Sequence, residues 1–269
     1  VAELHSADHV ERCNRSHITM KRLLRLPLFI ICICGFLVAN ALFASAQNAQ
    51  LAFAGLRAAN GKGQFLAVKV DATGNLYLLY DQKDGIRVVK TDSAANQILA
   101  EVLIGAAGDS GTSMALDPAG NVYVTGTTTS GSLATTSGVP FPTRADSSTN
   151  SFLAKFDSGL NTIFITYAGS GRMAASSVSA TMDRVFITGS IFAATLPITP
   201  SAIIQSPAAG SFSNGFVEAF NTAGTTLVYA TYLSGLNGDT VPARIESDIN
   251  DNAYIAGYTT TSGYPTLSP

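Results

Sequence analysis

Histidine and cysteine, on which much of enzyme chemistry depends, occur only near the start of this chain. All six precede Gln47: His5, His9, His17, Cys13, Cys32 and Cys34. Residues 47–269 therefore contain no imidazole base, thiolate nucleophile or disulfide, and no His or Cys ligand for zinc. Because most hydrolytic and redox mechanisms use these groups, we expect a protein without catalytic, cofactor-binding or metal-binding residues.

Charged residues are also scarce, at 13% of the chain, and tryptophan is absent. Removing the five basic and three acidic residues that precede Gln47 leaves a net charge of −4, which offers nothing to attract nucleic acid. Helical periodicity is also missing after this point, because glycine or proline interrupts most windows long enough for a helix. Abundant Gly, Ser, Thr and Ala favour many short strands joined by polar turns.

One early segment has the three parts of a signal peptide. A basic start at Met20–Arg25 is followed by the apolar run Leu26–Phe43 and by the small-residue motif Ala44–Ala46. We therefore interpret residues 20–46 as a signal peptide that is cleaved before Gln47, which places the mature protein outside the cell or in the cell envelope. A membrane anchor is the alternative, but the run is barely long enough to span a bilayer, and we expect no membrane span after cleavage.

The two ends of the sequence do not fit a complete protein. Residues 1–19 begin with Val and have a mixed polar composition, so we interpret them as sequence upstream of a true start at Met20. Pro269 falls inside a pattern that earlier parts of the chain complete. We expect further repeats or domains after it.

Residues 47–269 form an internal repeat with a period in the sixties. The motif DATGNLY at Asp71–Tyr77 matches DPAGNVY at Asp117–Tyr123. A related motif occurs as NVYVTG, RVFITG and AYIAG, and its final glycines, Gly126, Gly189 and Gly257, are 63 and 68 residues apart. A second element, FLAKFD at Phe152–Asp157 and FVEAFN at Phe216–Asn221, recurs in phase with the first. A repeat of this length indicates one supersecondary unit stacked on the next.

Each unit reads as four short strands, and the second unit is the clearest. Its expected strands are Thr112–Asp117, Asn121–Thr127, Phe152–Asp157 and Thr162–Ala168. Four antiparallel strands per unit at a fixed period predict an all-β fold, a β-propeller built from four-stranded blades, with about three and a half blades present. A β-sandwich with accidental internal similarity is the alternative.

The repeated motifs resemble the SBBP (seven-bladed β-propeller) repeat family of bacterial exported proteins. The resemblance is carried by DPAGNVYVTGTTTS at residues 117–130, FPT at 141–143, FLAKF at 152–156 and TYLSG at 231–235, and it covers Phe65–Pro269. It implies export and a propeller fold but no reaction. Two departures weaken it locally: Met182-Asp183 shortens the turn of the third unit, and the first unit lacks the proline-containing loop.

The repeated residues have structural and functional interpretations. Aspartates 71, 117 and 248 precede tight turns, where a carboxylate accepts backbone N–H groups; calcium binding by Asp117, or by Asp248, Asn250 and Asp251, is the alternative. The rings of Tyr77, Tyr123, Phe186 and Tyr254 share one strand position, which favours packing between blades over a carbohydrate platform. Gly126, Gly189 and Gly257 mark strand ends where backbones approach or bend.

The units differ most in the loop between their second and third strands, at 81–85, 128–150 and 191–214. These loops are rich in Ser, Thr, Ala and Pro; Arg144 and Asp146 are the only charged residues of the second, and the third has none. Long loops on a rigid scaffold commonly carry binding. They either bind a protein or carbohydrate weakly or are solvated insertions.

We therefore expect a non-catalytic interaction or scaffolding module of the cell envelope or the extracellular space. The alternative is a propeller lyase or glycosidase with paired carboxylates, which needs no histidine. Its candidate acids lie outside the repeated turns: Glu101, Asp109, Glu218, Asp239 and Glu246.

Expression in a Gram-negative host should export the protein with a mature amino terminus at Gln47, because a basic start, an apolar run and a cleavage motif occur together. Intact-mass measurement of the exported material checks this expectation. A membrane-embedded product that retains residues 26–43 would contradict it.

Overall fold

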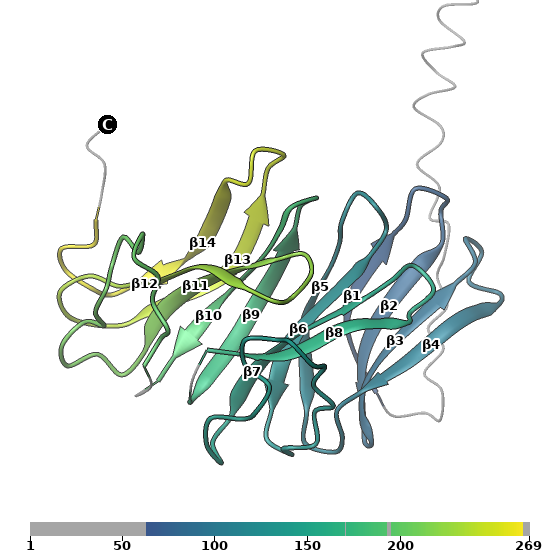
Figure 1. The fold of residues 1–269 in the computed structure, drawn as a ribbon, viewed down its shortest axis with the longest axis horizontal. Helices are drawn as coiled ribbons and strands as arrows, with labels where there is room; N and C mark the ends of the chain where they lie inside the picture. The colour runs from purple at the N-terminus through teal and green to yellow at the C-terminus, as the bar shows by residue number, and fades with distance from the viewer. Residues whose placement is uncertain (1–62, 170, 193–194, 266–269) are drawn as a thin grey trace, which may run out of the picture. The chain divides into compact units, whose positions relative to one another are not determined.

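The computed structural model describes residues 63–169, 171–192 and 195–265, all of which belong to one compact unit. Fourteen β-strands form this unit (Figure 1). No helix in the described ranges has the length and hydropathy that a membrane span requires. The signal peptide and the upstream residues expected from the sequence lie outside the described residues.

The strands form four antiparallel sheets in chain order: three sheets have four strands, and the last has two. The first sheet contains β1 (Gln64–Val70), β2 (Leu76–Gln82), β3 (Gly85–Thr91) and β4 (Ile98–Ile104). The second contains β5 (Ser110–Leu116), β6 (Val122–Thr128), β7 (Asn150–Phe156) and β8 (Thr162–Ala168). The third contains β9 (Met173–Ala180), β10 (Arg184–Ile191), β11 (Asn214–Asn221) and β12 (Leu227–Leu233), and the fourth contains β13 (Thr240–Ser247) and β14 (Ala253–Thr259).

These sheets confirm the blade assignment that the repeat predicted. In the second sheet each observed strand begins and ends within two residues of its expected bounds, and β8 matches them at both ends. The first strands of successive sheets, β1, β5, β9 and β13, are in contact with their neighbours in that order. This arrangement of all-antiparallel sheets is that of consecutive propeller blades.

Successive sheets pack face to face through apolar side chains. Between the first two sheets, Tyr77 and Leu79 share a buried cluster with Val124 and Phe152, and between the next two, Tyr123 and Leu153 share one with Ile187 and Phe216. The alternation of side chains along a strand produces this pattern, because neighbouring residues point to opposite faces of the sheet and so towards different neighbouring sheets. The apolar residues of one strand therefore contribute to two interfaces in turn.

The aspartates at the turns act as the turn interpretation predicted. Asp117 accepts hydrogen bonds from the backbone N–H groups of Ala119 and Asn121, both at 2.9 Å, and from Asn121 Nδ2 at 2.8 Å. Asp71, Asp157 and Asp248 accept the same set from residues two and four positions later. The glycines of the first two turns, Gly74 and Gly120, have φ of 87° and 81°.

The glycine that ends each repeated motif lies against a bulge in the neighbouring first strand. The register of β5–β6 shifts between Gly111 and Ser113, next to Gly126, and the same shift recurs beside Gly189 and Gly257. A Cβ added to Gly126 would lie 2.1 Å from the carbonyl oxygen of Ser110, so no other residue fits without moving backbone. Because bulges increase strand twist, the repeated pair fixes the same twist in each sheet.

Truncation of Tyr123 to Ala should lower the free energy of unfolding by about 3 kcal/mol or more, because its ring is fully buried between two sheets. The matched control is Tyr254→Ala, at the same position of the repeat but with a ring that is 60% exposed, which should cost about 1 kcal/mol or less. Urea denaturation of the two variants compares them. Equal losses would show that the position, and not burial by the next sheet, sets the effect.

Candidate functional site

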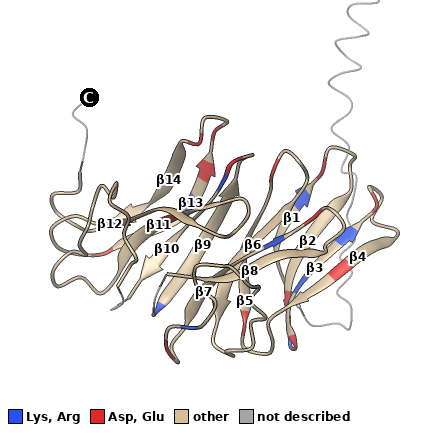
Figure 2. Cartoon of the chain, viewed as in Figure 1, with Lys and Arg blue, Asp and Glu red and all other residues tan. Residues whose placement is uncertain are grey.

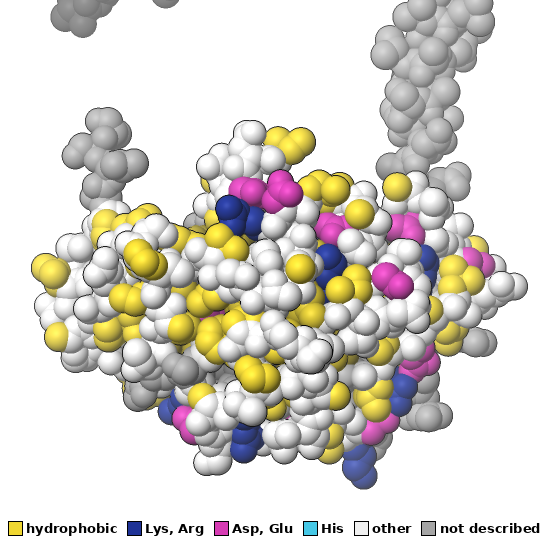
Figure 3. All heavy atoms as spheres, in the orientation of Figure 1, with side chains coloured by type: hydrophobic (Ala, Val, Ile, Leu, Met, Phe, Trp, Pro, Cys, Tyr) yellow, Lys and Arg dark blue, Asp and Glu magenta, His cyan; other side chains and the backbone are white. Residues whose placement is uncertain are grey.

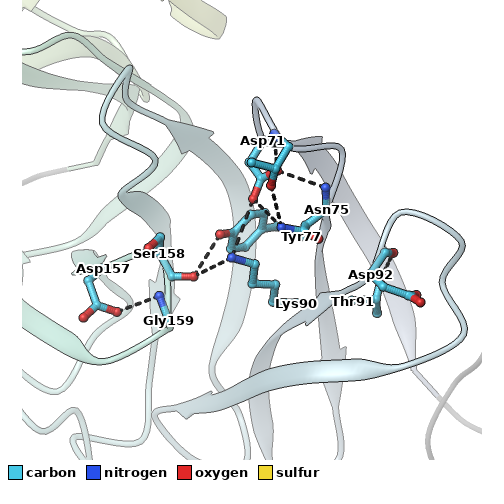
Figure 4. Close-up of polar contacts among 10 residues, drawn as sticks. Asp71, Asn75, Tyr77, Lys90, Thr91, Asp92, Asp157, Ser158 and Gly159 are labelled. Atoms are coloured by element: carbon cyan, nitrogen blue, oxygen red, sulfur yellow. Dashed lines mark hydrogen bonds and ion pairs between the residues drawn. The ribbon is translucent and has the colours of Figure 1, made fainter.

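A cluster of three polar side chains lies at the turn end of the first sheet (Figure 4). The ammonium of Lys90 donates to the carbonyl oxygen of Ser158 at 2.9 Å, lies 3.6 Å from Asp71 Oδ2, and sits 5.0 Å from the centre of the Tyr77 ring. The Tyr77 hydroxyl donates to the same carbonyl oxygen at 2.9 Å. Since Ser158 belongs to the β7–β8 turn, this cluster fastens the first sheet to the second.

The second sheet repeats the arrangement against the third. Lys155 Nζ donates to the carbonyl oxygen of Thr222, in the β11–β12 turn, at 2.8 Å and lies 5.0 Å from the centre of the Tyr123 ring. The Tyr123 hydroxyl donates to Asp117 Oδ2 at 3.2 Å. We call this three-residue arrangement of Asp, Tyr and Lys the inter-sheet clamp.

The third sheet lacks all three residues of the clamp at once. Thr181, Phe186 and Ala219 occupy the positions of Asp117, Tyr123 and Lys155. In this sheet, residues at the β9–β10 turn make the corresponding polar contact with the next sheet. The Thr181 hydroxyl donates to Asp251 Oδ1 at 2.5 Å, and Arg184 Nε lies 3.4 Å from the other carboxylate oxygen. The third sheet thus differs from the first two at all three clamp positions.

Burial and hydrogen bonding shift the pKa values of the clamp residues. Despite the cost of burial, hydrogen bonds from Thr73 and Asn75 hold the pKa of Asp71 far below its usual range. Burial opposes the charge of Lys90, but Tyr77 and Asp71 outweigh it, so its pKa is raised. Lys155 is more enclosed, and burial lowers its pKa although Asp117 partly compensates. These shifts leave Asp71 and Lys90 charged at neutral pH.

A groove of about 640 Å³ lies beside the first clamp, bordered by the turns at Asp71 and Asp117 and by Lys90 and Ser158. Its carboxylates are already used, because each accepts the backbone and side-chain donors of its own turn. The described residues include no group of three or more His, Cys, Asp or Glu side chains placed to hold a metal ion. The groove therefore supplies contact surface but no uncommitted carboxylate.

The aromatic residues that share one strand position divide into two groups. Tyr77, Tyr123 and Phe186 are buried between sheets, as the packing interpretation predicted. Tyr254 differs, because no described strand covers its face of the β13–β14 sheet, and its hydroxyl donates to Asp248 Oδ2 at 3.0 Å. The sequence could not distinguish these cases, since the residue and its strand position are the same.

The five candidate acids of the enzyme alternative have separate environments. Glu101 pairs with Arg87 on the first sheet, and Glu246 is exposed on β13. Asp109 accepts hydrogen bonds from the backbone N–H groups of Ala106, Thr129 and Ser130, and Asp239 accepts them from Phe212 and Ser213. The last two carboxylates therefore fix the ends of the long loops.

Glu218 is the one acid with an unusual environment. It lies on β11, is fully buried, and neither carboxylate oxygen has a hydrogen-bond partner among the described residues. The equivalent position of the second sheet is Ala154, so the repeat does not require an acid here. Burial raises the pKa of Glu218 to about 8. The carboxyl group is therefore largely protonated at neutral pH.

The long loops are ordered along the outer edges of the sheets, a role that neither interpretation of the sequence had foreseen. In the second sheet, Thr136 N–H donates to the Ile165 carbonyl and Tyr167 N–H to the Phe141 carbonyl, both at 3.0 Å. The third loop bonds to β12 in the same way at Ala230 and Tyr232. The loops thus cover strand edges that would otherwise be free to pair with another chain.

Sequence reasoning missed a cluster at the two ends of the third loop. The Arg172 guanidinium lies 5.1 Å from the centre of the Phe192 ring, and this ring meets that of Phe212 edge-on at 5.7 Å. Arg172 and Phe212 are exposed. A comparison of the second and third units position by position could have found it, because these residues replace Gly108, Thr129 and Ser148.

Charge is unevenly distributed over the sheets. Strands β9–β12 carry two charged residues, Arg184 and Glu218, whereas charged side chains are frequent in the first sheet and in the turns (Figure 2). Figure 3 shows apolar side chains spread over the region of β11 and β12 with few charges among them. The strands of the third sheet therefore carry few charged side chains.

Comparison with protein families matches residues 102–134 and 228–265 to SBBP, a family described as a beta-propeller repeat. Each match begins in the fourth strand of one sheet and continues into the next sheet, so the family unit spans a sheet boundary. No curated protein matches the chain. The comparison agrees with the resemblance inferred from the sequence motifs.

Replacing Glu218 with Gln should remove a pH dependence of stability. The pKa of Glu218 is raised in the folded state, so its contribution is fully present below its ordinary value of 4.5 and is lost as the pH rises towards 8. The free energy of unfolding of the wild type should therefore fall, relative to that of the variant, by up to roughly 1.4 kcal/mol per pH unit in this window. Urea denaturation at several pH values, with Glu101→Gln as control, tests this; parallel wild-type and Glu218→Gln curves would contradict it.

Proposed function

Because the chain carries SBBP β-propeller repeats, we propose that it is an exported, non-catalytic interaction or scaffolding module of the cell envelope or the extracellular space. One observation carries this proposal. The polar residues of the turns and of the clamp hold the first two sheets to their neighbours, whereas the units differ most in the long loops between their second and third strands. Function then belongs to the variable loops, and the repeats supply a rigid support.

The recurring polar groups are engaged inside the protein. The turn carboxylates accept the N–H groups of their own turns, and the clamp lysines donate to carbonyl oxygens of the next sheet. Asp109 and Asp239 fix the loop ends from the connections between sheets. Such groups rigidify the scaffold and leave little chemistry for a substrate, which supports a platform role.

Export is supported by the sequence, through the signal peptide expected at residues 20–46. Residues 47–269 contain no cysteine, so their folding is independent of the redox state of the compartment. The expected signal peptide is therefore the feature that supports a role outside the cytoplasm.

A lyase or glycosidase is the second candidate, because its chemistry needs two carboxylates across one substrate-sized gap. Its best residues would be Glu101 and Glu246, which are accessible, and Glu218, whose raised pKa is typical of an acid catalyst. Glu218 is enclosed between two sheets, Glu101 is paired with Arg87, and Glu246 lies on a different sheet from Glu101. These separate placements favour binding over catalysis.

The full exported chain should co-sediment with isolated envelope or extracellular polymer in a saturable manner and leave that polymer intact. Size-exclusion chromatography of the polymer before and after incubation measures turnover. Depolymerisation that disappears in Glu218→Gln or Glu246→Gln would favour the enzyme. Failure to bind any envelope or extracellular fraction would reject the interaction role.

A further inference from the structure

The cluster of Arg172, Phe192 and Phe212 is a feature of the third unit that the repeat does not require. In register, these residues lie where the second unit has Gly108, Thr129 and Ser148. The second unit builds the same loop ends with small residues, for example through a hydrogen bond from Thr129 Oγ1 to the Gly108 carbonyl at 2.9 Å. The second unit thus builds its loop ends without an arginine or an aromatic ring, and these three residues are particular to the third unit.

The cluster is held rigidly by its backbone. Phe192 N–H donates to the Arg172 carbonyl at 2.9 Å, while the N–H groups of Phe212 and Ser213 each donate to Asp239 Oδ1 at 2.8 Å. These bonds fix both ends of the loop and therefore the position of both rings. A ligand would meet a preformed surface, which lowers the entropic cost of binding.

The exposed parts of the cluster are a planar cation and an aromatic ring. Phe212 is 69% exposed, and the Arg172 guanidinium, beside the Phe192 ring, has no hydrogen-bond or ion-pair partner among the described residues. Loop residues 191–214 contain no charged side chain, and the nearby Asp239 carboxylate is occupied by the N–H groups of Phe212 and Ser213, so Arg172 is the charged group left to pair with a ligand. A guanidinium binds a carboxylate through two parallel hydrogen bonds.

We propose that Arg172, Phe192 and Phe212 form a binding site for an acidic saccharide, with the sugar ring packed on Phe212 and its carboxylate paired with Arg172. This inference rests on the proposed function as an exported interaction module and names its ligand class. The apolar face of a pyranose matches an exposed ring, and the acid matches the unpaired cation. Phe192 is a positioning residue, because its ring lies beside the guanidinium.

An acidic peptide is the other ligand with this charge, and the backbone around the cluster argues against it. Extended peptides are usually held by main-chain hydrogen bonds to a free strand edge. The N–H groups at this surface already donate within the protein, and the loop itself covers the neighbouring edge of β12. The N–H groups of Phe192, Phe212 and Ser213 are thus already used, which favours a ligand recognised through the Arg172 and Phe212 side chains.

Titration calorimetry of the full exported chain with a short oligogalacturonate tests the proposal. We expect saturable binding that weakens with added salt but persists, and about tenfold or greater loss of affinity in Arg172→Gln, because a charge-assisted pair is removed. Phe212→Ser, which introduces the residue of the second unit, should cause a similar loss. Arg244→Gln and Ile203→Ser, exposed residues outside the cluster, are the matched controls and should bind as the wild type does.

Two comparison ligands test which class of ligand the site binds. The methyl-esterified form of the same oligosaccharide keeps the sugar rings and loses the charge, so it should bind about tenfold more weakly or worse. Polyglutamate keeps the charge and lacks the rings, and it should also bind more weakly. Equal affinity for either ligand, or unchanged affinity in both cluster variants with unaltered melting temperature, would overturn the proposal. Envelope binding that survives in both variants would leave the interaction role standing and reject only this site.

Discussion

Face-to-face packing of one sheet on the next is the interaction on which the structure depends. A four-stranded sheet whose strands carry apolar residues on both faces cannot bury them alone, so each sheet needs a neighbour on either side. A bulge recurs opposite Gly126, Gly189 and Gly257, and bulges increase strand twist, so the second, third and fourth sheets share this twisting device. Stacking protects faces but not edges, and in the second and third sheets the long loops cover the outer edges.

The inter-sheet clamp restricts the relative position of two packed sheets. Apolar faces attract one another in many relative positions, whereas Lys90 and Tyr77 meet one carbonyl oxygen, that of Ser158. A cation that is desolvated beside an aromatic ring is costly unless it is paired, so a displaced neighbour would leave Lys90 or Lys155 without its acceptor. The third sheet lacks the clamp and uses Thr181, Arg184 and Asp251 instead, which shows that alternative polar contacts can set the same relative position.

Local patterns in the sequence were sufficient to predict the strands, the turns and the propeller blades. The Asp-to-Asn turn, which occurs in the first, second and fourth units, and the alternation of side chains along each strand act over a few positions. Contacts between units were beyond such reasoning: nothing near Lys155 in the sequence points to Thr222, and Tyr254 lies in a motif, NAYIAG, similar to the NVYVTG motif of the buried Tyr123. The role of the long loops was also missed, because pairing with β8 or β12 depends on an edge that exists only in the folded sheet.

The third unit differs from the second at the residues that anchor its long loop. Met173 stands where the second unit has Asp109, so the carboxylate that fixes the start of the loop in the second unit is missing here. The contact of Phe192 with Arg172 and Phe212 replaces that anchor, and an apolar contact between buried groups would have been enough for this purpose. Instead Phe212 remains largely in solvent, and Arg172 has no ion-pair partner among the described residues. Anchoring explains why the rings meet, but it does not explain why Phe212 and Arg172 are exposed, and a partner that covers the Phe212 ring and pairs with the guanidinium accounts for both.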